Sequence, residues 1–140
     1  MIFLGFGALG TAAHVIRPLR LGDSGIIRPI GALLAAMALG LASWARASMH
    51  AAGTNVRPSQ PSLAIVAEGP YKLTRNPMYL SLCILLLGIG LMADEAAFVL
   101  LAPPLAATLH FGVILREERY LTRKFGGTYL QYKLRVRRWI

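Results

Sequence analysis

The sequence predicts an all-α fold, a polytopic membrane bundle of about four transmembrane helices that forms a single domain over residues 1–140. Hydrophobic residues make up 56% of the chain and charged residues only 15%, whereas a soluble domain carries about a quarter charged residues. The mean hydropathy is +0.55, and the apolar residues come in long blocks. The net charge of +9 lies mostly toward the C-terminal end. Beside apolar spans, this basic excess is typical of a cytoplasmic membrane face, so we expect no nucleic acid partner.

The first two predicted spans precede a long polar loop. Residues 1–16 are apolar apart from Thr11 and His14, and no basic residue precedes them, so we interpret the segment as a membrane helix rather than a signal peptide. As a helix, this segment reaches only about 24 Å, a little short of a bilayer core of about 30 Å. Residues 26–45 form the second span, whose many small residues suit close packing of helices in lipid.

The third and fourth predicted spans, residues 77–93 and 96–115, flank a short acidic turn. Asn76 is a favourable N-cap for the third span, and Pro77 suits its first helical position, where the missing N–H of proline costs nothing. The proline pair at 103–104 predicts a kink in the fourth span.

Two polar segments, the loop 46–76 and the tail 116–140, are predicted to share one side of the membrane. We expect an ordered loop whose apolar run 63–67 packs beneath it or on the membrane surface. In the tail, the helix should continue to Phe125, stop at the glycines 126–127 and be followed by a second short helix. An even number of spans puts the N-terminus on the same side, which carries 12 of the 15 lysines and arginines. The positive-inside rule then predicts both termini on the cytoplasmic face of the inner membrane.

Candidate binding residues surround the expected start of the third span. Tyr71, Arg75 and Tyr79 lie close to Asn76 in the sequence. The first free N–H groups of a helix and its positive dipole end attract anions, so this grouping predicts a platform for an anion or a cofactor.

The charged tail offers a second group of candidates. Glu117 and Glu118 end a membrane helix, where either function or pairing with neighbouring arginines explains a carboxylate equally well. His110 comes seven residues before Glu117, so we expect it on the same helix face, as a hydrogen-bonded core group rather than a ligand. Tyr129 and Tyr132 fit an interfacial aromatic belt or the lining of a site.

The motif content excludes several chemistries. Cys83 is the only cysteine, so the chain forms no internal disulfide and no cysteine-based metal site. His14 and His50 have no metal-ligand spacing with His110, so we predict no metal. The sequence has no glycine-rich dinucleotide motif, no P-loop and no nucleophile elbow, which excludes a soluble nucleotide-binding domain of the Rossmann kind.

Three motifs in order resemble one known family. They are Gly-Pro-Tyr-Lys-Leu-Thr-Arg-Asn-Pro-Met-Tyr at 69–79, the pair Glu117-Glu118 after two apolar helices, and Phe-Gly-Gly-Thr-Tyr-Leu-Gln-Tyr at 125–132. Over roughly residues 65–140 the chain resembles the isoprenylcysteine carboxyl methyltransferases and the related phospholipid methyltransferases. The resemblance implies a small polytopic enzyme that uses S-adenosylmethionine, bound in a pocket built by the last two membrane helices and the cytoplasmic tail.

The resemblance also implies which residues contact the cofactor. With their aromatic and charged neighbours, the candidate cofactor-binding residues are Tyr71, Arg75, Asn76, Pro77, Met78, Tyr79, Glu117, Glu118, Tyr129 and Tyr132. The family's histidine before the proline is Asn76 here. An arginine that helps bind the substrate in the eukaryotic prenylcysteine enzymes is Val113 here. Both departures concern the prenylcysteine substrate more than the cofactor.

The sequence therefore predicts transfer of a methyl group to a lipophilic small molecule or lipidated substrate among the membrane lipids. The acceptor could be a carboxylate of the isoprenylcysteine kind, a thiol or a lipid amine. We expect catalysis by positioning, because an anionic acceptor needs no general base. Two alternatives remain, a non-catalytic membrane scaffold or assembly protein and an NADPH-dependent membrane reductase of the sterol-reductase kind. The set of Tyr71, Tyr79 and Glu117 favours the methyl donor.

Overall fold

The computed structural model describes residues 2–16, 20–22, 24–54 and 63–140. Over these residues the chain is helical and contains no strand, so the predicted all-α class is confirmed. The elements in order are α1 (Ile2–Ile16), α2 (Ser24–Ala51), the 3-10 turn η1 (Gly69–Lys72), α3 (Pro77–Met92), α4 (Ala96–Leu109), the π-helical segment η2 (His110–Ile114), α5 (Leu115–Phe125) and α6 (Gly127–Arg135).

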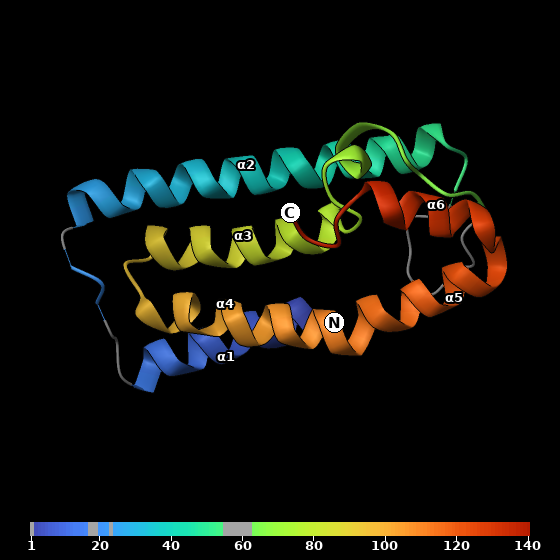
Figure 1. Ribbon diagram of the computed structural model, residues 1–140. Coiled ribbons are helices and arrows are strands. Elements are labelled where there is room, and N and C mark those ends of the chain that lie inside the picture. Colours follow the sequence, from blue (N-terminus) through green and yellow to red (C-terminus); the bar gives the residue numbers. More distant parts are fainter. Residues whose placement is uncertain (1, 17–19, 23, 55–62) are drawn as a thin grey trace.

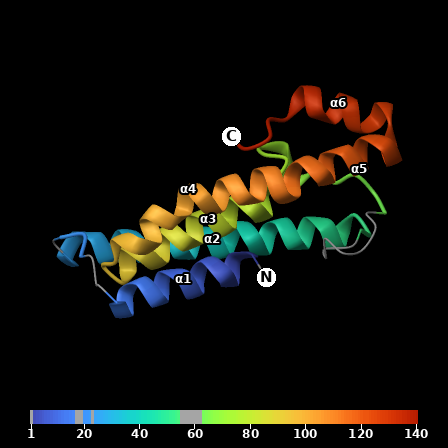
Figure 2. The same ribbon diagram turned by 90° about the horizontal axis from the view of Figure 1, so that it is seen from below.

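Four helices lie side by side as an elongated bundle, with α3 between α2 and α4 and with α1 beside α4 (Figures 1 and 2). The backbones of α2 and α3 approach closely because small residues face each other. A Cβ added at Gly31 would lie 2.5 Å from the backbone nitrogen of Met92, and one at Gly88 would lie 2.7 Å from that of Ala35. Only glycine fits at these two positions, which is how helices pack tightly in lipid.

Two helices in the described part of the chain are long and apolar enough to cross a membrane, Gly25–Ala51 and Ala96–Phe125. The first exposes a stripe of large apolar side chains at helical spacing, comprising Ile26, Ile30, Leu33 and Met37. A core helix of a soluble protein would bury such a stripe, whereas a lipid-facing helix exposes it. The apolar helices Ile2–Val15 and Pro77–Met92 are shorter, so the predicted crossing by four helices stays a prediction.

The end of the bundle where α3 turns into α4 is held together by its acidic residues. The Asp94 carboxylate accepts hydrogen bonds from the backbone N–H groups of Leu21 (3.0 Å) and Gly22 (3.3 Å). His14 Nδ1 lies 2.5 Å from Glu95 Oε2. These contacts attach the end of α1 and the following segment to the α3–α4 turn.

Several predicted boundaries need correction. The second predicted span ends at residue 45, but α2 continues to Ala51, because the next six residues contain no helix breaker. The proline pair at 103–104 lies inside α4, and the kink expected there stays a prediction, while a π-helical segment that the sequence did not predict follows at η2. The predicted stop at Gly126 is confirmed, since this residue has a φ of 53°, which favours glycine. The loop expected to be ordered includes residues 55–62, which lie outside the described residues.

Candidate functional site

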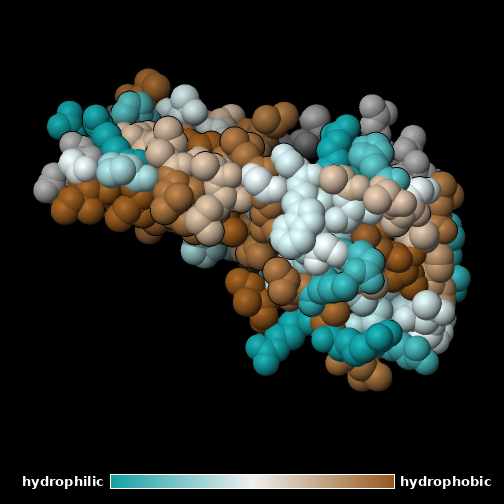
Figure 3. All heavy atoms as spheres, turned by 90° about the horizontal axis from the view of Figure 1, so that it is seen from above, coloured by the Kyte–Doolittle hydropathy of each residue, from teal (hydrophilic) through white to brown (hydrophobic). Residues whose placement is uncertain are grey.

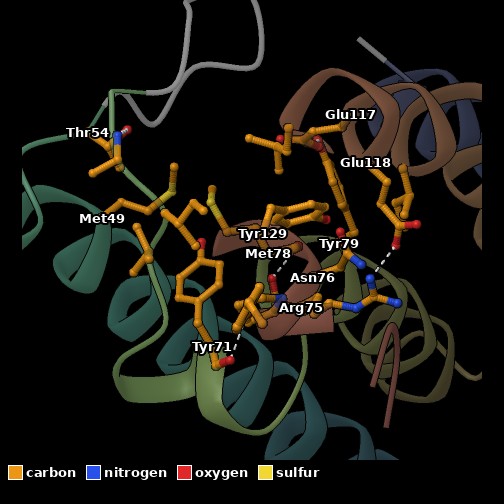
Figure 4. Close-up of a pocket in the computed structure, with 18 of the residues that line it drawn as sticks. Met49, Thr54, Tyr71, Arg75, Asn76, Met78, Tyr79, Glu117, Glu118 and Tyr129 are labelled. Atoms are coloured by element: carbon orange, nitrogen blue, oxygen red, sulfur yellow. Dashed lines mark hydrogen bonds and ion pairs between the residues drawn. The ribbon is translucent and has the colours of Figure 1, made fainter. Parts of the chain in front are cut away.

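A cavity of about 310 Å³ lies at the end of the bundle where η1, the start of α3, α5 and α6 meet (Figure 4). The C-terminal part of α2 and residues 64–66 complete its wall. The lining is mostly apolar with a few polar groups, and the volume falls at the lower end of the range for small-molecule sites, about 300 to 1,000 Å³.

All the residues that the sequence singles out as candidate cofactor ligands line this one cavity. They come from η1, the η1–α3 connection, α3, α5 and α6, and they are Tyr71, Arg75, Asn76, Pro77, Met78, Tyr79, Glu117, Glu118, Tyr129 and Tyr132. The structure thus brings together side chains up to 61 positions apart, as in the Tyr71–Tyr132 contact. That they bind a cofactor stays a prediction.

The C-terminal tail holds the segment that leads into α3. The backbone N–H of Arg75 donates to the carbonyl of Arg137 (2.9 Å), and the Thr74 hydroxyl donates to the carbonyl of Arg138 (3.1 Å). Asn76 occupies the N-cap position as predicted, but its side chain makes no capping bond. Its amide Nδ2 donates instead to the carbonyl of Arg138 (2.9 Å), so the side chain is oriented toward the tail and not toward the helix.

Glu118 is the centre of a buried ion-pair cluster. Arg138 binds its carboxylate with two hydrogen bonds, from Nε (2.8 Å) and Nη2 (2.9 Å). Arg75 Nη1 lies 3.2 Å from Glu118 Oε1, and Lys133 Nζ lies 3.9 Å from Oε2. Of the two explanations that the sequence left open for this glutamate, the structure shows ion pairing, but the partners are these three distant residues and not the neighbouring arginines that the sequence suggested.

Glu117 has a different environment from that of its neighbour. The Tyr79 hydroxyl donates to Glu117 Oε2 over 3.0 Å, and no cation pairs with Glu117 within the described part of the chain. Its other carboxylate oxygen is therefore available to accept hydrogen bonds from a molecule in the cavity.

Arg75 is a buried cation with unused donors. Its side chain is 9% exposed. Neither Nε nor Nη1 makes a hydrogen bond among the described residues, although Nη1 is within ion-pair distance of Glu118. Leaving a buried donor without an acceptor costs about 1 to 3 kcal/mol, more for a charged group. Arg75 is one of the residues that line the cavity, and Figure 4 shows its guanidinium directed toward Glu118.

The tyrosines supply neutral aromatic surface to the cavity, where Figure 4 shows Tyr71 and Tyr129 reaching in from different elements. Burial, followed by the negative charge of Glu117, raises the pKa of Tyr71 to about 12. Burial, followed by the charge of Glu118, raises the pKa of Tyr129 to about 12. Burial also raises the pKa of Tyr132, whose hydroxyl donates to the carbonyl of Tyr71 (2.8 Å). All three phenols therefore stay protonated at physiological pH.

The sequence reasoning missed the wall formed by the loop and α2. Met49 and Thr54 line the cavity, as do residues 64–66, which belong to the apolar run 63–67. The Thr54 hydroxyl accepts hydrogen bonds from the backbone N–H groups of Leu63 (2.8 Å) and Ala64 (3.4 Å), which joins Thr54 to the start of the apolar run. The apolar run 63–67 inside a polar loop was the sequence feature that could have identified this wall.

The prediction that His110 lies on the same helix face as Glu117, and so beside the candidate site, is wrong. The π-helical segment η2 begins at His110 and breaks the regular α-helical repeat before Glu117, and His110 does not line the cavity. Instead, the indole N–H of Trp139 donates to His110 Nδ1 (3.2 Å), and the two rings are stacked with centroids 6.4 Å apart. The expectation of a hydrogen-bonded histidine is confirmed.

The class that this fold and site define is a bundle of apolar helices with a cavity of small-molecule size at one end. The family model of the phospholipid methyltransferases matches residues 27–128. The chain therefore belongs to the phospholipid methyltransferase family, which is part of the isoprenylcysteine carboxyl methyltransferase-like group of membrane methyltransferases, so the predicted resemblance is confirmed. Membership implies a methyltransferase, and with the two apolar helices it indicates a membrane protein.

An uncharacterized protein of Haemophilus influenzae is 40% identical to the chain over 63 residues, which are 45% of this chain and 100% of the relative. No solved structure matches the chain. The family match includes the site residues from Tyr71 to Glu118 but ends before Tyr129, Tyr132 and Arg138.

Proposed function

We propose that the protein is an S-adenosylmethionine-dependent methyltransferase that methylates a lipophilic acceptor. The observation that carries the proposal is that one cavity is lined by the buried cation Arg75 and by Glu117, a carboxylate that no cation pairs with in the described part of the chain. The amino-acid end of the cofactor has a carboxylate and an ammonium group. A buried cation and a separate, unpaired carboxylate are the donor and acceptor that such a zwitterion requires.

Different residues of the cavity would bind different groups of this ligand. Arg75 and the first N–H groups of α3 would donate to the carboxylate, at a helix end where negative charge is stabilised. Glu117 would accept from the ammonium group or from hydroxyls, and the hydrogen bond from Tyr79 orients it for this purpose. Tyr71 and Tyr129 present aromatic faces, which attract a cationic sulfonium.

When bound, the cofactor supplies a methyl group on a positively charged sulfur, which is neutralised as the methyl leaves. The chain's own contribution is positioning and the exclusion of water. The apolar part of the wall is formed by Ala42, Ile65, Leu82, Ile114 and Leu121. A water-poor site of this kind favours reaction of an anionic acceptor with a cation, and it also accommodates an apolar acceptor chain. The acceptor is a carboxylate of the isoprenylcysteine kind, a thiol or a lipid amine.

We further propose that all four apolar helices are embedded in the inner membrane and that the cavity opens at the cytoplasmic face. The start of α3 and the pair α5–α6 lie at the same end of the bundle (Figure 1). This end carries the basic tail, and basic residues favour the cytoplasmic side. A water-soluble cofactor would reach the site from there.

The test uses the full-length protein in detergent and measures its thermal unfolding with S-adenosylhomocysteine or with NADPH. Stabilisation is expected with the first ligand alone, by about 2.7 kcal/mol at a hundredfold excess over Kd. Stabilisation by NADPH alone would instead support a membrane reductase, and no stabilisation by either would support a scaffold. Transfer of a labelled methyl group into a membrane extract, with identification of the product, then defines the acceptor.

A further inference from the structure

A second hollow lies on the other side of α5 from the cavity. This groove has a volume of about 630 Å³ and is lined by Leu115, Glu118, Arg119, Thr122, Arg123 and Lys133. Glu117 and Leu121, one helical turn apart, face the cavity, whereas Arg119 and Arg123, also one turn apart, face the groove. Glu118 lines both hollows, so α5 is the wall between them.

The groove has more positive charge than its single carboxylate can neutralise. Glu118 is already bound by two hydrogen bonds from Arg138 and lies within ion-pair distance of Arg75. Arg119 and Arg123 have no carboxylate partner in the parts of the chain that the structure describes. Two like charges four residues apart destabilise a helix, and an anion placed between them would remove that repulsion.

The surface next to the groove is apolar and uncovered. On α6, Leu130 is 47% exposed and Leu134 is 88% exposed, and these residues are one helical turn apart beside Lys133. Figure 3 shows hydrophilic side chains gathered at this end of the molecule next to hydrophobic ones. Exposed leucines beside basic residues on a short helix are typical of a helix that lies in the membrane interface.

We propose that the groove between α5 and α6 binds the phosphodiester headgroup of an anionic phospholipid. Arg119 and Arg123 donate to the phosphate oxygens, and Lys133 adds positive charge from the facing helix. The acyl chains lie against Leu130 and Leu134, a contact that a free phosphate ion would not use. Because α5 and α6 also form walls of the cavity, the bound lipid holds these walls together. The site does not depend on the proposed methyl transfer.

The test measures binding of short-chain phosphatidylglycerol to the full-length protein in neutral detergent, by native mass spectrometry and by thermal unfolding. Phosphatidylcholine of the same chain length and inorganic phosphate are the comparison ligands. The groove variant is Arg119→Gln with Arg123→Gln. The matched control, Arg116→Gln with Arg135→Gln, removes the same charge from exposed positions on the same two helices that line neither hollow.

We expect phosphatidylglycerol to bind wild type and control equally and the groove variant about thirtyfold more weakly, since each basic residue at an anionic surface contributes roughly fivefold. Equal weakening in both variants would overturn the proposal in favour of non-specific attraction. Stabilisation by inorganic phosphate equal to that by the lipid would overturn the choice of occupant. If the groove variant does not fold, Lys133→Gln on the facing helix is tested for a roughly fivefold loss, and unchanged binding there contradicts the site.

Discussion

At one end of the bundle, where α3 turns into α4, the buried Asp94 accepts hydrogen bonds from two backbone N–H groups and the buried Glu95 contacts His14. At the other end, Glu118 is similarly buried and gathers three cations, and both Glu118 and one of these cations, Arg75, line the cavity. The first cluster joins the end of α1 and the segment after it to the α3–α4 turn, and neither of its acidic residues lines the cavity. The second cluster lies on the cavity wall beside Glu117, and this difference separates a structural cluster from a candidate site.

Loss of the charge on Glu118 should have the largest effect on stability. In Glu118→Gln, Arg138 and the buried Arg75 lose their common carboxylate, so we expect a decrease of about 3 kcal/mol in the free energy of unfolding and weaker cofactor binding. Thermal unfolding and calorimetry with S-adenosylhomocysteine measure the two effects. Glu95→Gln at the opposite end should lower stability while leaving the affinity unchanged. If both variants affected the affinity equally, the contrast between the two ends would not hold.

Removal of the Arg75 guanidinium should lower the affinity for the cofactor while changing the stability of the fold little. In Arg75→Met, the cavity loses its cation, so the affinity for S-adenosylhomocysteine should fall about a hundredfold, the value of a charged hydrogen bond pair. The unliganded protein should lose little stability, because Glu118 keeps Arg138. Arg137→Ala is the control, since only the backbone carbonyl of Arg137 contacts the site segment. A hundredfold loss in the control as well would indicate general damage to the tail.

The contact between Tyr79 and Glu117 should contribute less to cofactor affinity than Arg75 does. Tyr79→Phe removes only the hydroxyl that orients the Glu117 carboxylate, so we expect an affinity about tenfold lower, and Glu117→Gln should also weaken binding. The loss of binding free energy in the double variant should be smaller than the sum of the losses in the two single variants, because each substitution disables the same contact. Calorimetric affinities that are unchanged in both single variants would show that Glu117 does not contact the cofactor.

At the opposite end, a small and local effect is expected. His14→Gln weakens the contact with Glu95 on a half-exposed residue, so the free energy of unfolding should fall by about 1 kcal/mol without a change in cofactor affinity. Thermal unfolding with and without S-adenosylhomocysteine tests this, and the ligand-induced shift should equal that of wild type.

The smallest effect is expected in the stability of the fold at alkaline pH. The folded-state pKa of Tyr129 is raised to about 12 from an ordinary value of 10, so its burial stabilises the fold fully below pH 10. This contribution is lost as the pH rises from 10 through 12. In unfolding measurements from pH 7 to 11, Tyr129→Phe should lose less stability above pH 10 than wild type does. The exposed Tyr120→Phe should follow the wild-type profile.

Much of the fold was predictable because it depends on local chemistry. The apolar blocks predict helices, Pro77 marks the first turn of α3, and Gly126 ends α5. The meeting of Tyr71 and Glu117 in one cavity was predictable from topology, since antiparallel helices bring the loop and the tail to the same end. What could not be predicted is which polar partner each side chain takes.

Two residues illustrate that limit. Asn76 stands at the N-cap position that its residue type favours, but its amide bonds to the carbonyl of Arg138, 62 positions away. Nothing in the local sequence shows that the Asn76 side chain donates to this distant carbonyl instead of accepting a capping bond from the N–H groups of α3. His110 does not share the expected helix face with Glu117, because the π-helical segment begins at His110. Its hydrogen-bond partner is Trp139, near the end of the chain.

The sequence by itself determined the helical class and the apolar helices, because hydrophobic blocks and helix-end residues act over a few positions. It also identified the candidate residues of η1, α3, α5 and α6 around the cavity, but not the wall formed by α2 and the loop. The tertiary structure alone decided that Glu118 is a paired charge and Glu117 an available one, although the two are neighbours in the chain. Adjacent residues on a helix point about 100° apart, so only the packing around α5 could decide which of them faces the tail's arginine and which faces Tyr79.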